Sequence, residues 1–271
     1  MSVINTNVSA LYSQGALKTN ERAMSTVMQQ LSTGSRVNSA KDDAAGLAIG
    51  QTMTAQIRGL NQAVRNLNDS INMMQTAEGA MTEVSSMLQR MRELAVQSSN
   101  GTYSDTQRGY LQTEYAALST QIGKVASETL WNGTPLLTSA TFTIQAGALS
   151  GQTIAVTISA MTISGLSLSS TDTVANVTAA RAAITSLDTA LNAVNSQRAT
   201  IGAGINQMAF GADNLTNISS NTTASRSSIM DTDYALATTQ LAKSQIIQQA
   251  ATAMLAQANQ QPQGMMALLK G

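Results

Sequence analysis

Cysteine and histidine are absent from this chain of 271 residues, and both absences exclude chemistry. Without them there is no thiolate nucleophile, no disulfide and no imidazole base, and the commonest zinc ligands are missing. Aromatic residues are only 3% and charged residues 11% of the chain, and 15 Lys and Arg balance 15 Asp and Glu. Such a composition suits neither a compact enzyme core nor a nucleic-acid surface. We therefore expect no enzymatic activity, no cofactor, no metal and no nucleic-acid partner.

Long apolar runs and a secretory leader are missing as well. No run approaches the ~20 residues that span a bilayer, so we expect no membrane insertion. The first cation is Lys18, so no basic start precedes an apolar stretch, and we expect no cleavable signal peptide. Proline occurs only at Pro135 and Pro262, which leaves the intervening stretch free to form a very long helix.

The dominant pattern is a heptad repeat, in which apolar residues alternate at spacings of three and four. It predicts one helix over about 44–98, roughly 80 Å long at ~1.5 Å per residue. A period of 3.5 residues also predicts left-handed supercoiling against partner helices. Glu78 interrupts the row, which consists of Met53, Ile57, Leu60, Val64, Leu67, Ile71, Met74, Met81, Val84, Leu88, Met91 and Ala95.

A second helix is predicted after the break at Asn100-Gly101. Ser104 with Gln107 three residues later resembles a capping box, and an apolar stripe runs on from Leu111 to Val125. A turn cluster ends this helix at 132–135.

A last long helix is predicted to begin with Asp172 as its N-cap. Its apolar row includes Arg198, for which two interpretations stay open: the aliphatic stem runs past the core, or the guanidinium pairs with a carboxylate across the bundle. The row consists of Ala180, Ile184, Leu187, Leu191, Val194, Arg198, Ile201, Ile205, Met208, Ala212 and Leu215.

The repeat changes to period two between the two long helices. Phe142 and Ile144 alternate with polar residues, as do Ile154 and Val156, and glycines lie between the two runs. This pattern predicts a small β-hairpin unit within 138–170. About thirty residues fall below the ~40 that an independent core usually needs, so the unit belongs to the bundle.

The two chain ends carry their own apolar rows, separated from the central pattern by polar positions near Ser219 and Arg226. We expect the helices that carry them to be disordered in the monomer, because a lone amphipathic end cannot offset the entropy of ordering it. The residues expected to mediate assembly are Val3, Ala10, Leu17, Met24, Leu31, Ile247, Ala251, Met254 and Ala258.

The predicted fold is therefore mainly α, with a long-helix coiled-coil bundle over 44–230 that includes the hairpin unit. Two terminal amphipathic helices, within 1–43 and 231–271, lie outside that bundle and serve assembly.

Three motifs have an alternative chemical interpretation. Asp42-Asp43 resembles a carboxylate pair for catalysis or a metal, but a helix N-cap is the simpler interpretation. The segment Asp231–Asp233 lacks the glycine and the later glutamate of a calcium loop. Gly202-Ala-Gly204 lacks the third glycine of a dinucleotide loop, so close packing between helices is favoured.

Several segments, taken together and in this order, resemble bacterial flagellins. The N-terminal half carries four of them and the C-terminal half three. They are Ile4–Asn7, Leu31–Ile49, Gln75–Ala80, Leu88–Gln97, Asp231–Ala235, Ile246–Ala250 and Leu255–Gln260. Larger flagellins insert outer domains in the middle, and here that insertion is essentially absent.

The resemblance implies a structural subunit that polymerises into the extracellular filament, with the terminal helices in the inner filament core. It implies export in an unfolded state through the flagellar type III apparatus, which needs no cleaved signal. It also implies as partners further copies of the chain, an export chaperone for the C-terminal tail, and the filament cap and hook-associated proteins. A hook–filament junction protein of the same superfamily is the alternative, since such proteins share the end helices.

The resemblance further implies recognition by the vertebrate toll-like flagellin receptor. The alternative is that the charged members are solvated and the leucines pack in the core, and both interpretations can hold together. Arg90, Leu94 and Gln97 follow the spacing of one helix face, which we expect to point outward, while Leu88 belongs to the core row that points in. The matching positions are Leu88, Arg90, Leu94, Gln97 and Glu114.

Overall fold

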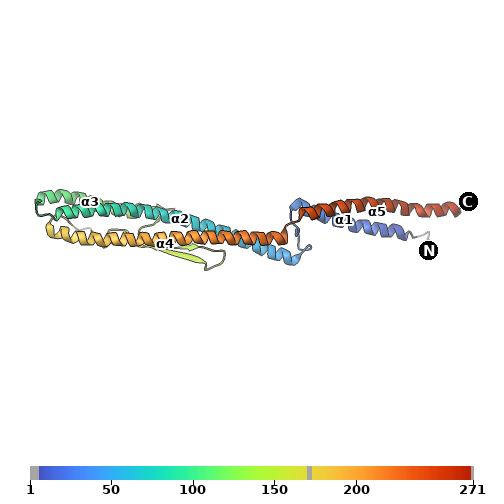
Figure 1. The fold of residues 1–271 in the computed structure, drawn as a ribbon, viewed down its shortest axis with the longest axis horizontal. Helices are drawn as coiled ribbons and strands as arrows, with labels where there is room; N and C mark the ends of the chain where they lie inside the picture. The colour runs from blue at the N-terminus through green and yellow to red at the C-terminus, as the bar shows by residue number, and fades with distance from the viewer. Residues whose placement is uncertain (1–5, 170–172, 270–271) are drawn as a thin grey trace. The chain divides into compact units, whose positions relative to one another are not determined.

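The computed structural model describes residues 6–169 and 173–269, with side chains up to residue 260. Within these residues it contains five helices and two short antiparallel strand pairs (Figure 1). The elements are α1 (Val8–Thr33), α2 (Ala44–Ser98), α3 (Asp105–Glu128), β1 (Leu130–Trp131), β2 (Thr134–Pro135), β3 (Ala140–Gln145), β4 (Thr153–Ile158), α4 (Val177–Met230) and α5 (Tyr234–Leu269). The predicted fold class, a mainly helical protein with a small strand unit in the middle, is confirmed.

The chain divides into two compact units, and α2 and α4 contribute to both. The first unit consists of residues 1–55 and 220–271, and the second of residues 56–219. We refer to them as the terminal unit and the bundle unit.

In the bundle unit, α2, α3 and α4 surround one apolar core. Ion pairs show that α2 and α4 are antiparallel, since Arg92 lies beside Asp188 while Glu78 lies beside Arg198. The second pair also decides between the two interpretations of Arg198, which pairs across the bundle at 3.6 Å. The largest fully buried side chains of the helices are Leu67, Met74, Met81, Leu88, Met91, Leu94, Tyr115 and Ile122.

The row that α4 buries is shifted by one residue from the predicted one at four positions. Ile184, Leu191 and Ile205 are only partly buried at its edge. Small or polar residues take the central places instead, namely Ala183, Ala190, Gln197 and Gly204. They leave room for the strand unit, because a Cβ on Gly204 would lie 3.3 Å from the Val156 side chain of β4.

The β3–β4 hairpin pairs Ala140 with Ile158 and Gln145 with Thr153, as the alternation predicted. Gln197 of α4 fixes this hairpin at its end, since its amide donates to the Thr157 carbonyl at 2.9 Å and accepts from the Ser159 amide at 3.2 Å. The strand unit thus belongs to the core of the bundle.

Helix starts follow local capping chemistry. Asp43 accepts a hydrogen bond of 2.8 Å from the Gly46 amide, which confirms the N-cap interpretation of this carboxylate. The Ser104–Gln107 capping box is present at the start of α3. At the start of α4, Asn176 accepts from the Ala179 amide at 2.8 Å and is the observed cap. The predicted cap, Asp172, lies outside the described residues.

Candidate assembly and recognition surfaces

The terminal unit is built on an antiparallel pair of helices, α1 and α5. Three hydrogen bonds from side chains to carbonyls set the register: Asn7 to Ala258 at 2.8 Å, Asn20 to Ser244 at 2.8 Å, and Tyr234 to Leu31 at 3.2 Å. Residues 7, 20 and 31 thus lie beside residues 258, 244 and 234, so the two helices run in opposite directions.

The α1 row predicted for assembly is partly buried in this pair. Its described members, at intervals of seven, are Ala10, Leu17, Met24 and Leu31, while Val3 lies outside the described residues. Between them lie Asn20 and Val27, which are the most buried side chains of α1.

On α5 the predicted row combines two different faces. Ala251 and Ala258 belong to the covered face, which runs at intervals of seven from Ala237 and includes the buried Ser244. Ile247 and Met254, in contrast, are 41% and 64% exposed. The small residues face α1 because they let two backbones approach closely, and the larger apolar side chains remain outside.

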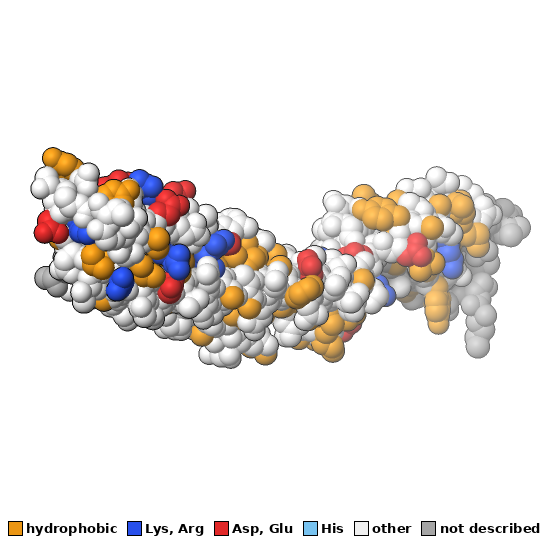
Figure 2. Space-filling model, turned by 60° about the vertical axis from the view of Figure 1, so that its left-hand side comes forward, with side chains coloured by type: hydrophobic (Ala, Val, Ile, Leu, Met, Phe, Trp, Pro, Cys, Tyr) orange, Lys and Arg blue, Asp and Glu red, His pale blue; other side chains and the backbone are white. Residues whose placement is uncertain are grey.

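Large apolar side chains stand out from both helices of the terminal pair. Tyr12 is 79% exposed and Ile246 66%. The other members of this outer apolar set are Val8, Leu11, Met28, Leu236, Ile247 and Met254. Figure 2 shows hydrophobic side chains interrupting the polar surface on the terminal unit. So much apolar surface on a single pair of helices is typical of an interaction face.

The segment between α1 and α2 lies beside the end of α4 and the start of α5, and Arg36 joins them. Its guanidinium donates to the carbonyls of Ser228 at 3.1 Å and Ile229 at 2.6 Å, which are among the last carbonyls of α4. Its backbone amide donates to the Met230 carbonyl at 2.6 Å. The carboxylate of Asp233 then caps α5 by accepting from the Ala235 amide at 2.9 Å. These bonds explain why α4 stops where the sequence pattern only weakens.

The proposed receptor patch is only partly at the surface. Leu88 is 0% exposed, as its place in the core row predicted, whereas Leu94 is 1% exposed, so the expectation that Leu94 faces outward is wrong. Both pack in the core of the bundle unit, because α2 is covered there by α3 on one side and α4 on the other. Arg90, Gln97 and Glu114 are exposed as expected.

Arg90 connects α2 to α3 at the surface. Its Nε lies 2.8 Å from Glu114 Oε1, and its Nη1 lies 3.0 Å from Glu93 Oε2. The hydrogen bonds to Glu114 and then Glu93 raise the pKa of Arg90 above its ordinary value. Gln97 donates at 3.1 Å to the Tyr103 hydroxyl in the loop that follows. Figure 2 shows charged side chains of both signs gathered on this end of the bundle unit.

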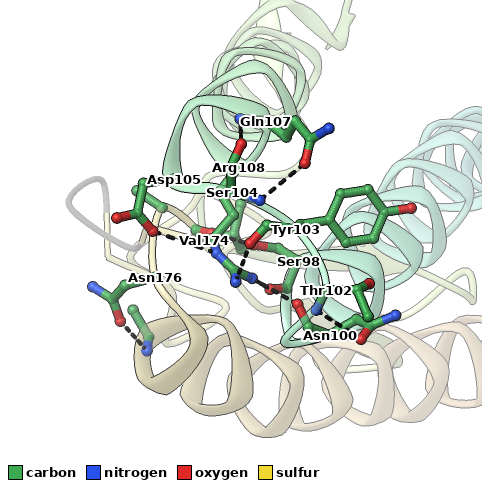
Figure 3. Close-up of polar contacts among 12 residues, drawn as sticks. Ser98, Asn100, Thr102, Tyr103, Ser104, Asp105, Gln107, Arg108, Val174 and Asn176 are labelled. Carbon is green, nitrogen blue, oxygen red and sulfur yellow. Dashed lines mark hydrogen bonds and ion pairs between the residues drawn. The ribbon is translucent and has the colours of Figure 1, made fainter.

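The α2–α3 turn behind this patch is held by Arg108, which sequence reasoning missed. Its side chain is 5% exposed and donates to the carbonyls of Ser98, Asn100 and Tyr103, the last at 2.7 Å (Figure 3). A single guanidinium therefore organises the whole turn. An arginine one turn after a cap was the signal that could have shown it.

Chemical sites are not apparent in the part of the chain that the structure describes. No group of three or more acidic residues there is placed to hold a metal ion. No described helix combines the length and apolar character needed to cross a bilayer.

Three features of the fold define a class of protein. They are the long paired helices, the core of aliphatic and methionine side chains, and the terminal pair with apolar side chains left outside. They are the features of a structural subunit that associates with copies of itself.

Comparison with known proteins identifies the family. Residues 4–141 match the bacterial flagellin N-terminal helical region, and residues 184–269 match the bacterial flagellin C-terminal helical region. A flagellin of Halalkalibacterium halodurans is 41% identical over 271 residues, covering 99% of this chain and all of the relative. The flagellar filament 30.7 kDa core protein of Treponema maltophilum is 38% identical and covers 98% of this chain and 99% of its own. The crystal structure of Bacillus cereus flagellin, 31% identical, covers 56% of this chain and 88% of that one with a TM-score of 0.49.

The chain belongs to the bacterial flagellin family, whose members are structural subunits of the extracellular flagellar filament. This confirms the resemblance that the sequence motifs indicated.

Proposed function

We propose that this flagellin polymerises through the outer apolar set of α1 and α5, and that its terminal segments 1–43 and 231–271 form the inner core of the filament. The observation that carries the proposal is the outward position of side chains such as Tyr12, Ile246 and Met254 on helices that already pair with each other. A neighbouring copy is the partner that would cover them along the whole length of a polymer.

The terminal pair is expected to order only in the polymer. The α5 side of its internal seam consists of small residues, namely Ala237, Ser244 and Ala258, and Asn20 places an amide on the α1 side. These side chains bury little apolar area against the entropy of ordering two helices. Disorder in the monomer also suits export in an unfolded state by the flagellar type III apparatus, without a cleaved signal, and capture of the tail by an export chaperone. Contacts with the filament cap and hook-associated proteins would use the same ends, and none of these roles requires catalysis.

Recognition by the vertebrate toll-like flagellin receptor would use the exposed polar members of the patch. Arg90, Gln97 and Glu114 offer a planar donor fork, an amide and a carboxylate on one surface. Leu88 and Leu94 would contribute indirectly, because their packing in the core sets the positions of α2 and α3. Arg90→Ala should therefore lower receptor activation by monomer, whereas Arg65→Ala, on the same helix, should leave it unchanged.

Polymerisation of truncated and substituted chains tests the proposal. Full-length protein that is salted out should form long uniform filaments by electron microscopy. Removal of 1–40 and 234–271 should leave a soluble helical protein by circular dichroism that forms none. Filaments from the truncated chain would show that the ends are not the assembly elements.

A charge placed in the outer apolar set gives a finer test. Ile246→Glu should abolish filaments, because it buries an unpaired carboxylate in the interface. Gln249→Glu adds the same charge one turn away without removing an apolar side chain, and it should interfere much less.

A further inference from the structure

Phe210 is an exposed aromatic side chain in a chain that has very few. It lies on α4 in the bundle unit and is 74% exposed. Asp213 lies one helical turn further on the same face and is also exposed. No ion pair joins Asp213 to another residue that the structure describes. The two residues form a projecting aromatic ring with a free carboxylate beside it, which we call the α4 knob.

A groove of matching size opens elsewhere on the bundle unit. It has a volume of about 240 Å³ and lies on α3, between the helix and Ile163. The buried Tyr115 lines it, together with small residues such as Ser119 and Gly123. A cavity of roughly 150 Å³ already admits benzene, so the groove has room for a phenyl ring.

The charge beside the groove is opposite to the charge beside the knob. Lys124 is exposed, follows Gly123 directly and lies one turn beyond Thr120, which lines the groove. Among the described residues it takes part in no ion pair. A ring inserted in the groove would therefore bring a carboxylate toward an ammonium group.

The knob and the groove cannot meet within one molecule. Arg198 of α4 lies beside Glu78 of α2, and Glu114 of α3 lies beside Arg90. Counting along the helices from these two pairs at ~1.5 Å per residue separates Phe210 from Ser119 by on the order of 30 Å along the bundle. Because the two features lie on different helices and far apart, one copy can insert its knob into one neighbour while its groove receives the knob of another, which is a heterologous contact that repeats from copy to copy. Repeated heterologous contacts that do not close into a ring produce an open helical polymer.

We infer that Phe210 of one copy inserts into the α3 groove of a neighbouring copy, with Asp213 facing the neighbour's Lys124. This knob-and-groove contact rests on the proposed polymerisation and adds to it an interface outside the terminal helices. Exposed aromatic residues that enter a pocket on a partner are typical hot spots of association.

Substitutions at the knob should weaken polymerisation without affecting the fold. Phe210→Ala in the full-length chain should raise the critical concentration for filament formation at least about tenfold, as loss of a hot spot would. Tyr110→Ala is the matched control, because Tyr110 is 72% exposed on α3 but does not line the groove. Gly123→Leu should act like Phe210→Ala, because a side chain there meets open space in the monomer and would fill the groove. Circular dichroism of each monomer verifies that the helices are retained.

Charge exchange tests the pairing itself. Asp213→Lys and Lys124→Asp should each weaken polymerisation, and the double variant should restore it. Because the chain has no cysteine, Phe210→Cys combined with Ser119→Cys should form disulfides only between copies, visible as a ladder in non-reducing gels. If the wild type forms filaments and Phe210→Ala forms them at the same critical concentration, this inference is overturned while the proposed function stands. The same holds if the double charge variant polymerises no better than the single variants. A wild-type chain that forms no filaments would overturn both this inference and the proposed function.

Discussion

The side-chain amide of Asn20 on α1 donates a hydrogen bond of 2.8 Å to the carbonyl of Ser244 on α5, at a point where both residues are buried. A buried amide needs an acceptor, and the carbonyl of Ser244 supplies it in this register, so the bond favours the observed pairing of the two helices. Polar residues at core positions of coiled coils specify register in this way, at a cost in stability.

Asn20→Leu should therefore loosen the register of the α1–α5 pair while leaving its helices intact. Cysteine pairs report the register: Leu17→Cys with Gln248→Cys is in register, and Leu17→Cys with Leu241→Cys is shifted by one heptad. The Asn20→Leu background should give the shifted disulfide, whereas the parent should give only the first.

This measurement belongs in filaments where cysteine-bearing subunits are diluted into an excess of the cysteine-free wild type, so that every disulfide forms within one molecule. An unchanged disulfide pattern in the Asn20→Leu background would mean that Asn7 and Tyr234 suffice to set the register.

Periodicity predicted the helices well, because a heptad row fixes both the element and its buried side. It could not tell which of two rows on α5 faces α1. Ala251 and Ile247 belong to different rows that both repeat every seven residues, and size rather than hydrophobicity decides between them. The same limit applies to Gly204 on α4, where the strand unit demands a small residue that no helical pattern reveals.

The surface patch shows a second limit of sequence reasoning. Arg90 and Gln97 could be placed outside because charged and amide groups stay solvated. Leu88 belongs to the predicted core row, whereas Leu94 keeps the spacing of one helix face with Arg90 and Gln97. Only the coverage of α2 by two helices shows that Leu94 is buried as well. Arg36 and Arg108 were missed because their partners are carbonyls, which carry no sequence signature.

Two glycines on α4 give a controlled test of the packing against β4. A Cβ at Gly202 meets nothing within 4 Å, so Gly202→Ala should raise the free energy of unfolding by up to about 1 kcal/mol through helix propensity. Gly204→Ala gains the same propensity but puts a methyl group 3.3 Å from Val156, which should cancel most of the gain. Gly204→Leu should cost about 1–3 kcal/mol through overpacking. Urea denaturation of the three variants measures these differences, and equal gains for both alanine variants would contradict the close contact.

A buried and an exposed arginine should differ sharply in their contribution to stability. Arg108→Met leaves the carbonyls of Ser98, Asn100 and Tyr103 without their donor and should cost about 2–4 kcal/mol. Arg92→Met breaks the ion pair with Asp188, in which both side chains are nearly half exposed, and should cost less than about 1 kcal/mol. Thermal unfolding of the monomers compares them. A small effect at Arg108 would show that water replaces its hydrogen bonds in the turn.

Acid should destabilise the turn at residues 38–42 that precedes α2, because the ionised carboxylate of Asp42 stabilises this turn. Asp42 Oδ2 accepts from the Ser39 hydroxyl at 2.9 Å, and from the amides of Ser39 at 3.0 Å and Asn38 at 3.3 Å. The hydroxyl first, and then the two amides, lower the pKa of Asp42 below its ordinary value of 3.8. A carboxyl group whose pKa is depressed by folding stabilises the folded turn above its unfolded pKa, and this contribution is lost as the pH falls through the folded pKa.

The turn should therefore be ordered at neutral pH and weaken only below pH 3.8, the ordinary value for this group. Protection factors for hydrogen exchange at the amides of Asn38 and Ser39 in filaments of the full chain should fall over that acid range. Asp42→Asn should lower the protection at neutral pH and remove its acid dependence, since the neutral amide does not titrate. Asp69→Asn, an exposed change on α2, is the matched control and should leave the acid dependence in place. Acid dependence that persists in Asp42→Asn would show that another carboxylate controls the turn.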